Sequence, residues 1–277
     1  MNISKIAVGT NLFGYGKRQE FGIESLLKCK EKMPDQIDLF NLQFKNEKDL
    51  REQEGFTTLK CLEKTSKEVC NGDRGLPITR EMFDKLADLG YEYFCFINSD
   101  IIVTPNFFKE IENNKNHDAY ISSRLAIEGD NVKDLNFEIK LNDPTSLVKN
   151  SHYQVSGFDT FTINTKWWKK NHNLFPEYVY AVVYWDTHYA TILLKNGNTF
   201  MQNKKPTIFH IIHEDASSAQ CTEFTYNQST FYNHYREDFD RWHRYFFNVL
   251  IKRGVEQNYL YPHKNELELE KIYFKGL

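Results

Sequence analysis

Asn98, Ser99 and Asp100 follow directly after a strongly apolar, aromatic run at residues 91–97, a pattern typical of a buried strand. Open α/β sheets bind their ligands at the carboxyl ends of strands. Carboxylates are preferred ligands of hard divalent cations, so Asp100 could hold such an ion beside a phosphate-bearing ligand. Asn98 could exchange a hydrogen bond with a ribose of that ligand, and Ser99 is a further candidate contact to it. The alternative is that the three residues only form the turn that ends the strand.

Two later carboxylates are candidates for a catalytic base. Asp186 lies at the start of a predicted helix over residues 185–194, where the helix dipole favours a carboxylate and should keep it ionised. Its alternative role is a plain helix N-cap. Asp159, in the strand-like segment 157–164, is the second candidate base or a ligand for an acceptor hydroxyl. The alternative for Asp159 is a hydrogen-bonding group in a turn or at the edge of the core.

His210 and His213 fall in and after the last predicted strand, residues 207–212. A neutral imidazole can bind Mn²⁺, so both histidines are candidate metal ligands together with Asp100. If the strand continues through both positions, they face opposite sides of the sheet and only one of them meets the metal. A structural histidine with satisfied hydrogen bonds is the alternative for each.

Four further residues could contact a nucleotide. Arg74 and Arg80 could bind a diphosphate, because guanidinium groups make paired hydrogen bonds to phosphate. For Arg80, on a predicted helix, a surface ion pair is the alternative. Thr10 and Asn11 end the first predicted strand and are placed to meet a nucleobase. The nearby segment 14–16, Gly-Tyr-Gly, lacks the spacing of phosphate-binding or dinucleotide-binding loops.

The elements that would position these residues alternate between strands and helices, which indicates a mostly parallel sheet. Helical periodicity is clearest at residues 78–89, ended by Gly90, and is present at residues 20–33. Thr104 could cap a helix that has Pro105 at its first position. From about residue 222 the chain becomes helical and aromatic. The strands are expected at residues 3–8, 37–42, 57–62, 91–97, 119–122, 157–164 and 207–212.

Composition excludes several classes of protein. The chain has 277 residues, 40% of them hydrophobic, and a net charge of −3, which gives no electrostatic footprint for a nucleic-acid backbone. Five cysteines without a Cys-x-x-Cys pair argue against a disulfide framework and a structural zinc site. The apolar runs are too short to cross a membrane and the first residues do not form a signal peptide, so we expect a soluble, cytoplasmic protein.

The donor-side motifs resemble those of the GT-A glycosyltransferases. Residues 74–80, Arg-Gly-Leu-Pro-Ile-Thr-Arg, precede the helix to Gly90 and the strand into Asn98-Ser99-Asp100. In that family, a helix leads to a strand ending in an Asp-x-Asp motif. The resemblance implies that Asp100 binds Mn²⁺ or Mg²⁺. Asn98 replaces the first Asp of the motif, a position that contacts ribose or metal, and so leaves Asp100 as the main ligand.

The later motifs follow in the order that the same family has. Residues 157–161, Gly-Phe-Asp-Thr-Phe, are similar to a strand near the acceptor. Tyr184-Trp185-Asp186 resembles the acidic motif that carries the base of inverting members. The segment from His210 to Asp215 is similar to the late histidine motif that completes the metal site, and Thr10 and Asn11 match the nucleobase loop. The resemblance spans roughly residues 1 to 215.

The sequence therefore predicts an α/β, GT-A-like (Rossmann-like) fold with a mostly parallel sheet flanked by helices. We expect a glycosyltransferase domain at residues 1–220 and a helical extension at residues 221–277 packed on it, which could form a lid or a homodimer contact. The predicted activity is metal-dependent transfer of a sugar from a nucleotide-sugar, most simply a UDP-sugar, to an acceptor hydroxyl, with inversion. The alternatives are a retaining mechanism, a nucleotidyltransferase, and a non-catalytic carbohydrate-binding protein on a degenerate transferase fold.

Overall fold

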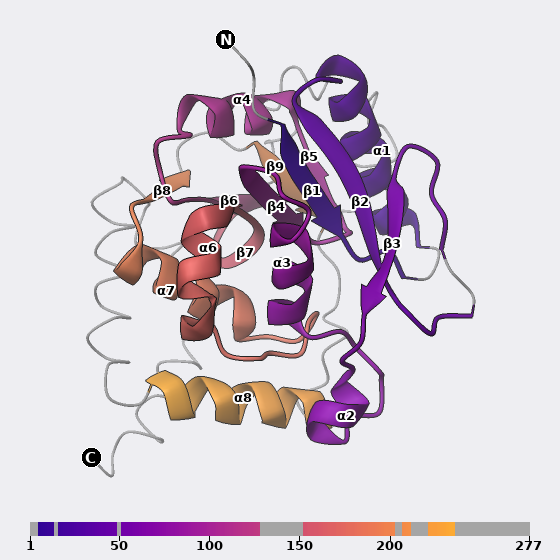
Figure 1. Ribbon diagram of the computed structural model, residues 1–277, viewed down its shortest axis with the longest axis vertical. Helices are drawn as coiled ribbons and strands as arrows, with labels where there is room; N and C mark the ends of the chain where they lie inside the picture. Colours follow the sequence, from indigo (N-terminus) through magenta and orange to yellow (C-terminus); the bar gives the residue numbers. More distant parts are fainter. Residues whose placement is uncertain are drawn as a thin grey trace.

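The computed structural model describes residues 5–13, 16–48, 51–127, 152–202, 207–211 and 221–235. It forms a central sheet with helices on both faces (Figure 1). The elements follow the chain as β1 (Ile6–Thr10), α1 (Lys17–Lys32), β2 (Ile37–Phe44), β3 (Thr57–Leu62), α2 (Ser66–Cys70), α3 (Thr79–Ala87), β4 (Tyr93–Ile97), β5 (Ile101–Val103), α4 (Pro105–Asn113), β6 (Ala119–Ile127), β7 (His152–Asn164), α6 (Thr165–Asn171), the 3₁₀ turn η3 (His172–Leu174), α7 (Trp185–Asn196), β8 (Thr199–Gln202), β9 (Ile208–Ile211) and α8 (Thr222–Tyr235).

The strands of the sheet run in the order β3-β2-β1-β4-β7-β6-β9-β5, and β8 also pairs with β6. Strands β3, β2, β1 and β4 are parallel to one another, and the pairs β6–β8 and β6–β9 are also parallel. The pairs β4–β7, β6–β7 and β5–β9 are antiparallel. The expected mostly parallel α/β sheet is therefore confirmed, with antiparallel pairs in its second half.

Side chains of the central strands alternate between the two faces of the sheet, as a strand requires. On β4, Tyr93, Cys95 and Ile97 pack with α1 and α4 in one buried cluster. Phe94 and Phe96 point the other way and pack with α3, α6 and α7. The sheet is thus buried on both faces, which explains why the segment 91–97 is apolar throughout.

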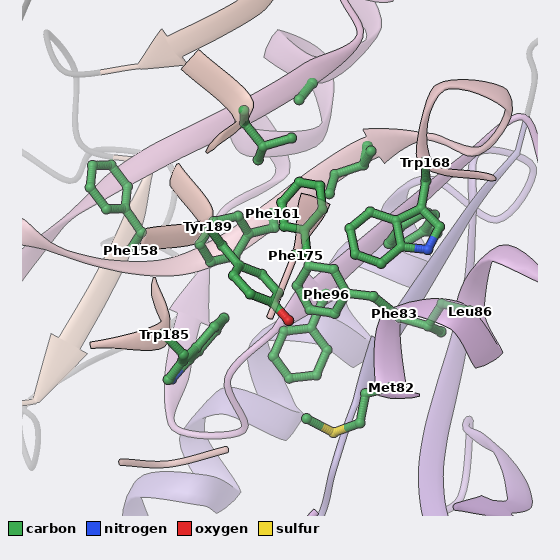
Figure 2. Close-up of a cluster of buried hydrophobic side chains, with 14 of the residues drawn as sticks. Met82, Phe83, Leu86, Phe96, Phe158, Phe161, Trp168, Phe175, Trp185 and Tyr189 are labelled. Carbon is green, nitrogen blue, oxygen red and sulfur yellow. The ribbon is translucent and has the colours of Figure 1, made fainter. Parts of the chain in front are cut away.

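Phe83 of α3 lies at the centre of the aromatic cluster on that second face (Figure 2). Its ring centroid lies between 5.1 and 6.5 Å from the centroids of six other aromatic rings, which come from four elements of the fold. The six rings are those of Phe94, Phe96, Phe161, Trp168, Trp185 and Tyr189. Much of the high aromatic content of the chain is therefore used in packing α3, α6 and α7 onto the sheet.

Helix α1 packs closely against the chain that follows β4. Ser25 Oγ accepts a hydrogen bond of 3.0 Å from the Val103 N–H and donates one of 2.7 Å to the Gly22 carbonyl. A Cβ atom at Gly22 would lie 2.4 Å from the Ser99 carbonyl oxygen and 3.1 Å from that of Ile101. The absence of a side chain at position 22 lets α1 approach the turn at residues 98–100.

Most predicted elements are present, with differences at their ends. Helix α1 begins three residues before its predicted start, and β7 begins five residues before its predicted start. Helix α3 agrees with the prediction, and Gly90, with φ of 82°, follows its end as expected. Thr104 precedes α4 as expected, but its hydroxyl bonds Thr207 O and not the helix end. Helices α2 and α6 and strand β8 were not predicted. Among the described residues, no helix is long and apolar enough to span a membrane.

We predict that Gly22→Ala lowers the free energy of unfolding by about 1–3 kcal/mol, because its methyl group would overlap two backbone carbonyls. Gly16→Ala is the control, since nothing lies within 4 Å of a Cβ there; its effect should stay below about 1 kcal/mol. Urea denaturation of both variants measures the difference. Equal stability of the two would show that α1 does not press against residues 98–101.

Candidate functional site

The turn at residues 98–100 is fixed by the neighbouring strand β7. Ile97 pairs with Thr160 in the antiparallel ladder, which places Asn98 opposite Asp159. The Asn98 N–H donates to the Asp159 carbonyl at 2.9 Å, and Asn98 Nδ2 donates to Asp159 Oδ1 at 2.5 Å. Because the amide must donate to this carboxylate, Asn98 Oδ1 points away; it is buried and accepts no hydrogen bond from any described residue.

Arg124 of β6 places a positive charge beside Asp159. Its guanidinium donates to Asp159 Oδ2 in an ion pair, and the Asp159 side chain is only 7% exposed. Burial alone would lower the pKa of Arg124, but the charges of Asp159, Asp186 and Asp100 outweigh it and raise that pKa. The charges of three carboxylates from different parts of the fold therefore act on one guanidinium. We call Asp100, Asp159, Asp186 and Arg124 the carboxylate cluster.

Asp186 lies in the first turn of α7, as the sequence predicted. Its Oδ2 accepts a hydrogen bond of 3.1 Å from the Phe158 N–H, which ties the start of α7 to β7. Burial and then the charge of Asp159 raise the pKa of Asp186 to about 6, against backbone N–H donors and Arg124, which act to lower it. The helix start therefore does not lower the pKa of this group, because burial and a like charge outweigh the favourable helix terminus.

Asp100 and His210 meet at the edge of the cluster. The register of β5 and β9 pairs Ile101 with His210, and His210 Nε2 lies 3.3 Å from Asp100 Oδ2. The Asp100 side chain is 32% exposed, so it is accessible from solvent. His213 lies outside the described residues. Within the ranges that the structure covers, no group of three or more His, Cys, Asp or Glu side chains is placed to hold a metal ion.

A cleft of about 870 Å³ opens beside this cluster, at the carboxyl ends of β1 and β2. Its volume lies in the range of ligand-binding pockets. Lys48, Arg51 and Arg74 contribute positive charge to its wall, against Glu47 and Glu52. The remaining lining residues include two amides and three aromatic rings: Asn11, Leu12, Phe13, Gln43, Phe44, Gly75, Leu76, Pro77 and Tyr180.

Hydrogen bonds fix the floor of the cleft. Asn11 Nδ2 donates to Leu42 O at 2.6 Å, and Gln43 Nε2 donates to Leu12 O at 2.7 Å. These bonds join the chain after β1 to β2, and Asn11 lies in the cleft wall. Thr10, one residue earlier, is fully buried within β1 and is not part of the lining.

The cleft and the carboxylate cluster share a wall. Tyr180 lines the cleft, and its hydroxyl lies close to the backbone and side chain of Ser99. Burial and the charges of Asp100 and Asp159 raise the pKa of Tyr180. Gln19 Nε2 donates to Ser99 Oγ at 2.7 Å and its carbonyl accepts from Arg51. The Ser99 side chain, expected to contact a ligand, is instead buried and joins the two halves of the site.

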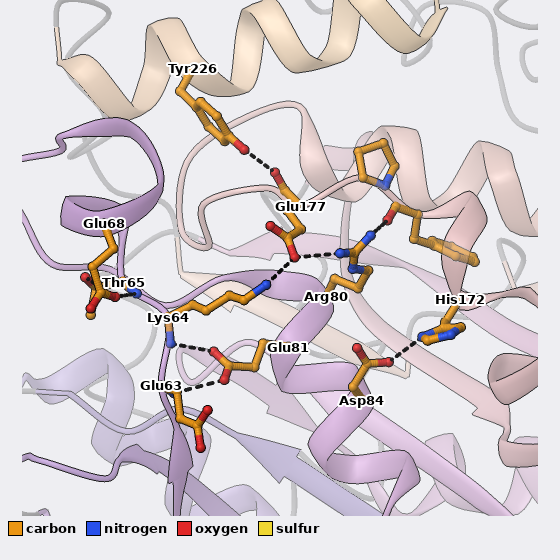
Figure 3. Close-up of polar contacts among 12 residues, drawn as sticks. Glu63, Lys64, Thr65, Glu68, Arg80, Glu81, Asp84, His172, Glu177 and Tyr226 are labelled. Atoms are coloured by element: carbon orange, nitrogen blue, oxygen red, sulfur yellow. Dashed lines mark hydrogen bonds and ion pairs between the residues drawn. The ribbon is translucent and has the colours of Figure 1, made fainter.

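The two predicted phosphate ligands have different surroundings. Arg74 is exposed at the cleft, and its backbone N–H donates to Glu223 Oε1 of α8 at 2.9 Å. Arg80 lies outside the cleft lining: it donates to Glu177 at 2.5 Å and to Phe175 O at 3.1 Å (Figure 3). The ion-pair role noted as its alternative is the one that the structure has, so Arg80 is not retained as a ligand contact.

Sequence reasoning missed several residues of the site. Arg124 follows the segment 119–122, where the strand was expected to end, and only the continuation of β6 to Ile127 places it beside Asp159. Arg51 was part of a charged stretch with no periodicity, and Gln19 and Tyr180 belong to no motif. The only local signal was the position of Arg124, shortly after the strand predicted at residues 119–122.

Comparison with models of protein families and with curated proteins gives no match. Solved structures give partial matches. A protein assigned as a nucleotide-diphospho-sugar transferase from Desulfovibrio desulfuricans G20 has a TM-score of 0.43 and 11% identity, over 87% of this chain and 98% of that one. The glycosyltransferase GlyE of Streptococcus pneumoniae TIGR4 has a TM-score of 0.41 and 13% identity, over 86% and 64%.

The bifunctional IspDF of Campylobacter jejuni has a TM-score of 0.37 and 14% identity, over 73% of this chain and 50% of that one.

We predict that Asp186→Asn changes how stability depends on pH. The raised pKa means that the Asp186 carboxyl binds its proton more tightly in the folded protein than in the unfolded chain. Protonated Asp186 therefore stabilises the fold at low pH, and this stabilisation is lost as the pH rises from about 4 to about 6. The amide removes the effect and can still accept from Phe158. Relative to the unmodified protein, the variant should gain up to roughly 3 kcal/mol between pH 4 and pH 7.

Denaturation at several pH values measures this difference, with Asp35→Asn at an exposed position as the control. A difference between the Asp186 variant and the unmodified protein that stays constant with pH would contradict the assignment.

Proposed function

We propose that this protein is a glycosyltransferase that takes a sugar from a nucleotide-diphosphate sugar and moves it to an acceptor hydroxyl. One observation carries the proposal: a nucleotide-sized cleft with cationic and amide groups shares the Tyr180–Ser99 wall with a cluster of carboxylates. Binding and reaction of a nucleotide-sugar need both the cleft and the carboxylate cluster. Its nucleotide requires a cleft with polar groups and positive charge, and its reacting end requires groups that stabilise a leaving diphosphate and accept a proton.

The cleft supports binding of the nucleotide. Asn11 and Gln43 offer amide groups for a nucleobase, and the exposed ring of Phe13 at the rim offers a stacking surface. Arg51 and Arg74 supply guanidinium groups that suit phosphate oxygens. A UDP-sugar is our first choice of donor.

The side chains at the diphosphate end fit a divalent cation of the Mn²⁺ or Mg²⁺ kind. Asp100 and His210 lie together and are the residues that would hold it, and their carboxylate and imidazole groups suit Mn²⁺ in particular. Two protein ligands are enough where the phosphates of a substrate complete the shell, as is common for these ions. When bound, such a cation would neutralise charge that develops on the leaving diphosphate.

Asp186 supports a role as catalytic base in an inverting transfer. The acceptor oxygen attacks the anomeric carbon, the bond from that carbon to the diphosphate oxygen breaks, and the base takes the proton of the attacking hydroxyl. A pKa of about 6 leaves the carboxylate largely ionised at neutral pH, yet basic enough to accept a proton. Asp159 is already bonded to Asn98 and Arg124, so we assign it to positioning and not to proton transfer.

The test is release of UDP or GDP from a panel of UDP- and GDP-sugars, with Mn²⁺ and without an acceptor. We expect slow release from at least one sugar nucleotide, as water replaces the acceptor. Asp100→Asn should reduce the rate roughly a hundredfold, equivalent to about 2.7 kcal/mol of lost stabilisation. The control is Asp88→Asn, which removes a carboxylate that is 70% exposed at the end of α3.

The control variant should keep the full rate. Full activity of Asp100→Asn, or no release and no calorimetric binding of any sugar nucleotide to the unmodified protein, would overturn the proposal.

A further inference from the structure

The segment between η3 and α7 carries part of the site in an unusual backbone conformation. Tyr180 lies within it, and Asp186 follows two residues after its last residue, Tyr184. Among the described residues, only three that are not glycine have positive φ, and two are here: Ala181 at 59° and Tyr184 at 85°. Such angles are disfavoured for residues with a side chain and persist only where the surroundings impose them.

Asn227 of α8 supplies such a constraint. It is fully buried, and its side chain meets the backbone of the segment as a neighbouring strand would. Asn227 Oδ1 accepts from the Val179 N–H at 2.8 Å, and Nδ2 donates to Val179 O at 2.9 Å. Nδ2 also lies 3.2 Å from Val182 O and 3.1 Å from Val183 O. One amide thus engages the backbone on both sides of Ala181.

Other contacts from α8 keep this helix in place over the same segment. Tyr226 donates its hydroxyl proton to Glu177 O at 3.1 Å (Figure 3), and Gln228 donates to the Tyr184 hydroxyl at 3.2 Å. The Tyr184 ring packs against Phe231 with centroids 5.1 Å apart. The side chains of α8 therefore follow the segment from its start to the residue before α7.

We infer that Asn227 is a positioning residue, which holds residues 179–184 so that Tyr180 stays against Ser99 and Asp186 stays at the Phe158 N–H. The inference rests on the proposed function and extends it to a helix beyond the cleft lining. Asn227 touches the backbone of the segment and none of the groups assigned to the ligand. Its loss should therefore affect the chemical step more than donor binding, because Asn11, Gln43 and Arg51 lie on other elements.

The test compares Asn227→Asp and Asn227→Ser with the matched control Asn233→Asp, which makes the same change at an exposed position of the same helix. In Asn227→Asp, the acceptor for Val179 N–H remains, but an oxygen replaces the donor that faces the three carbonyls. Two measurements follow: amide hydrogen exchange of residues 179–186 without ligand, and UDP release from UDP-glucose, UDP-galactose and UDP-N-acetylglucosamine with Mn²⁺.

For both Asn227 variants we expect faster exchange in residues 179–186 and a kcat lower by roughly tenfold to a hundredfold, with KM changed less than about twofold. The Asn233 control should match the unmodified protein. Unchanged exchange, unchanged kcat despite faster exchange, or failure of both Asn227 variants to fold would each overturn the inference. If the unmodified protein neither binds nor releases UDP or GDP from any sugar nucleotide of the full panel, the proposed function is overturned instead, and the exchange measurement still tests the contact.

Discussion

A carboxylate that is removed from water must be paired, and the pairing of Asp159 determines the geometry of the site. Asn98 and Arg124 both donate to this nearly buried side chain, which joins the end of β4 to β7 and β6. Breaking a buried ion pair by removing one partner costs about 3–5 kcal/mol, because the other charge stays behind. The position of Asp100, two residues after Asn98, is therefore part of how the edge of the sheet is stabilised.

The carboxylate cluster holds more negative than positive charge, and this imbalance affects its chemistry. The charges of three carboxylates act on one guanidinium, and burial together with the charge of Asp159 raises the pKa of Asp186 to about 6. A bound cation beside Asp100 would add the charge that the described side chains do not supply. The site also depends on backbone strain, since the positive φ angles of Ala181 and Tyr184 cost about 1–3 kcal/mol each. Sheet, α7 and α8 thus contribute to one site, although each belongs to a different layer of the fold.

The sequence was informative where a candidate site residue lies in, or next to, a helix or strand that can be predicted. Periodicity located α3 and β4. Asp100 and Asp186 were singled out because they follow or begin predicted elements, and His210 because it lies in the last predicted strand. Arg124, Arg51 and Asn227 were not, since their partners lie 35, 32 and 48 residues away in the chain and no local pattern encodes such contacts. The direction of the pKa shift of Asp186 also escaped prediction, because it depends on burial beside Asp159 and not on the helix start alone.

The central claim is that the cleft and the carboxylate cluster bind the two ends of one molecule. A crystal structure of the protein with UDP and Mn²⁺ tests it directly. The account predicts that the uracil lies near Asn11 and Gln43, that the diphosphate passes Tyr180, and that the cation lies between Asp100 and His210. A nucleotide bound away from this cleft, or a cation with no contact to Asp100, would contradict it.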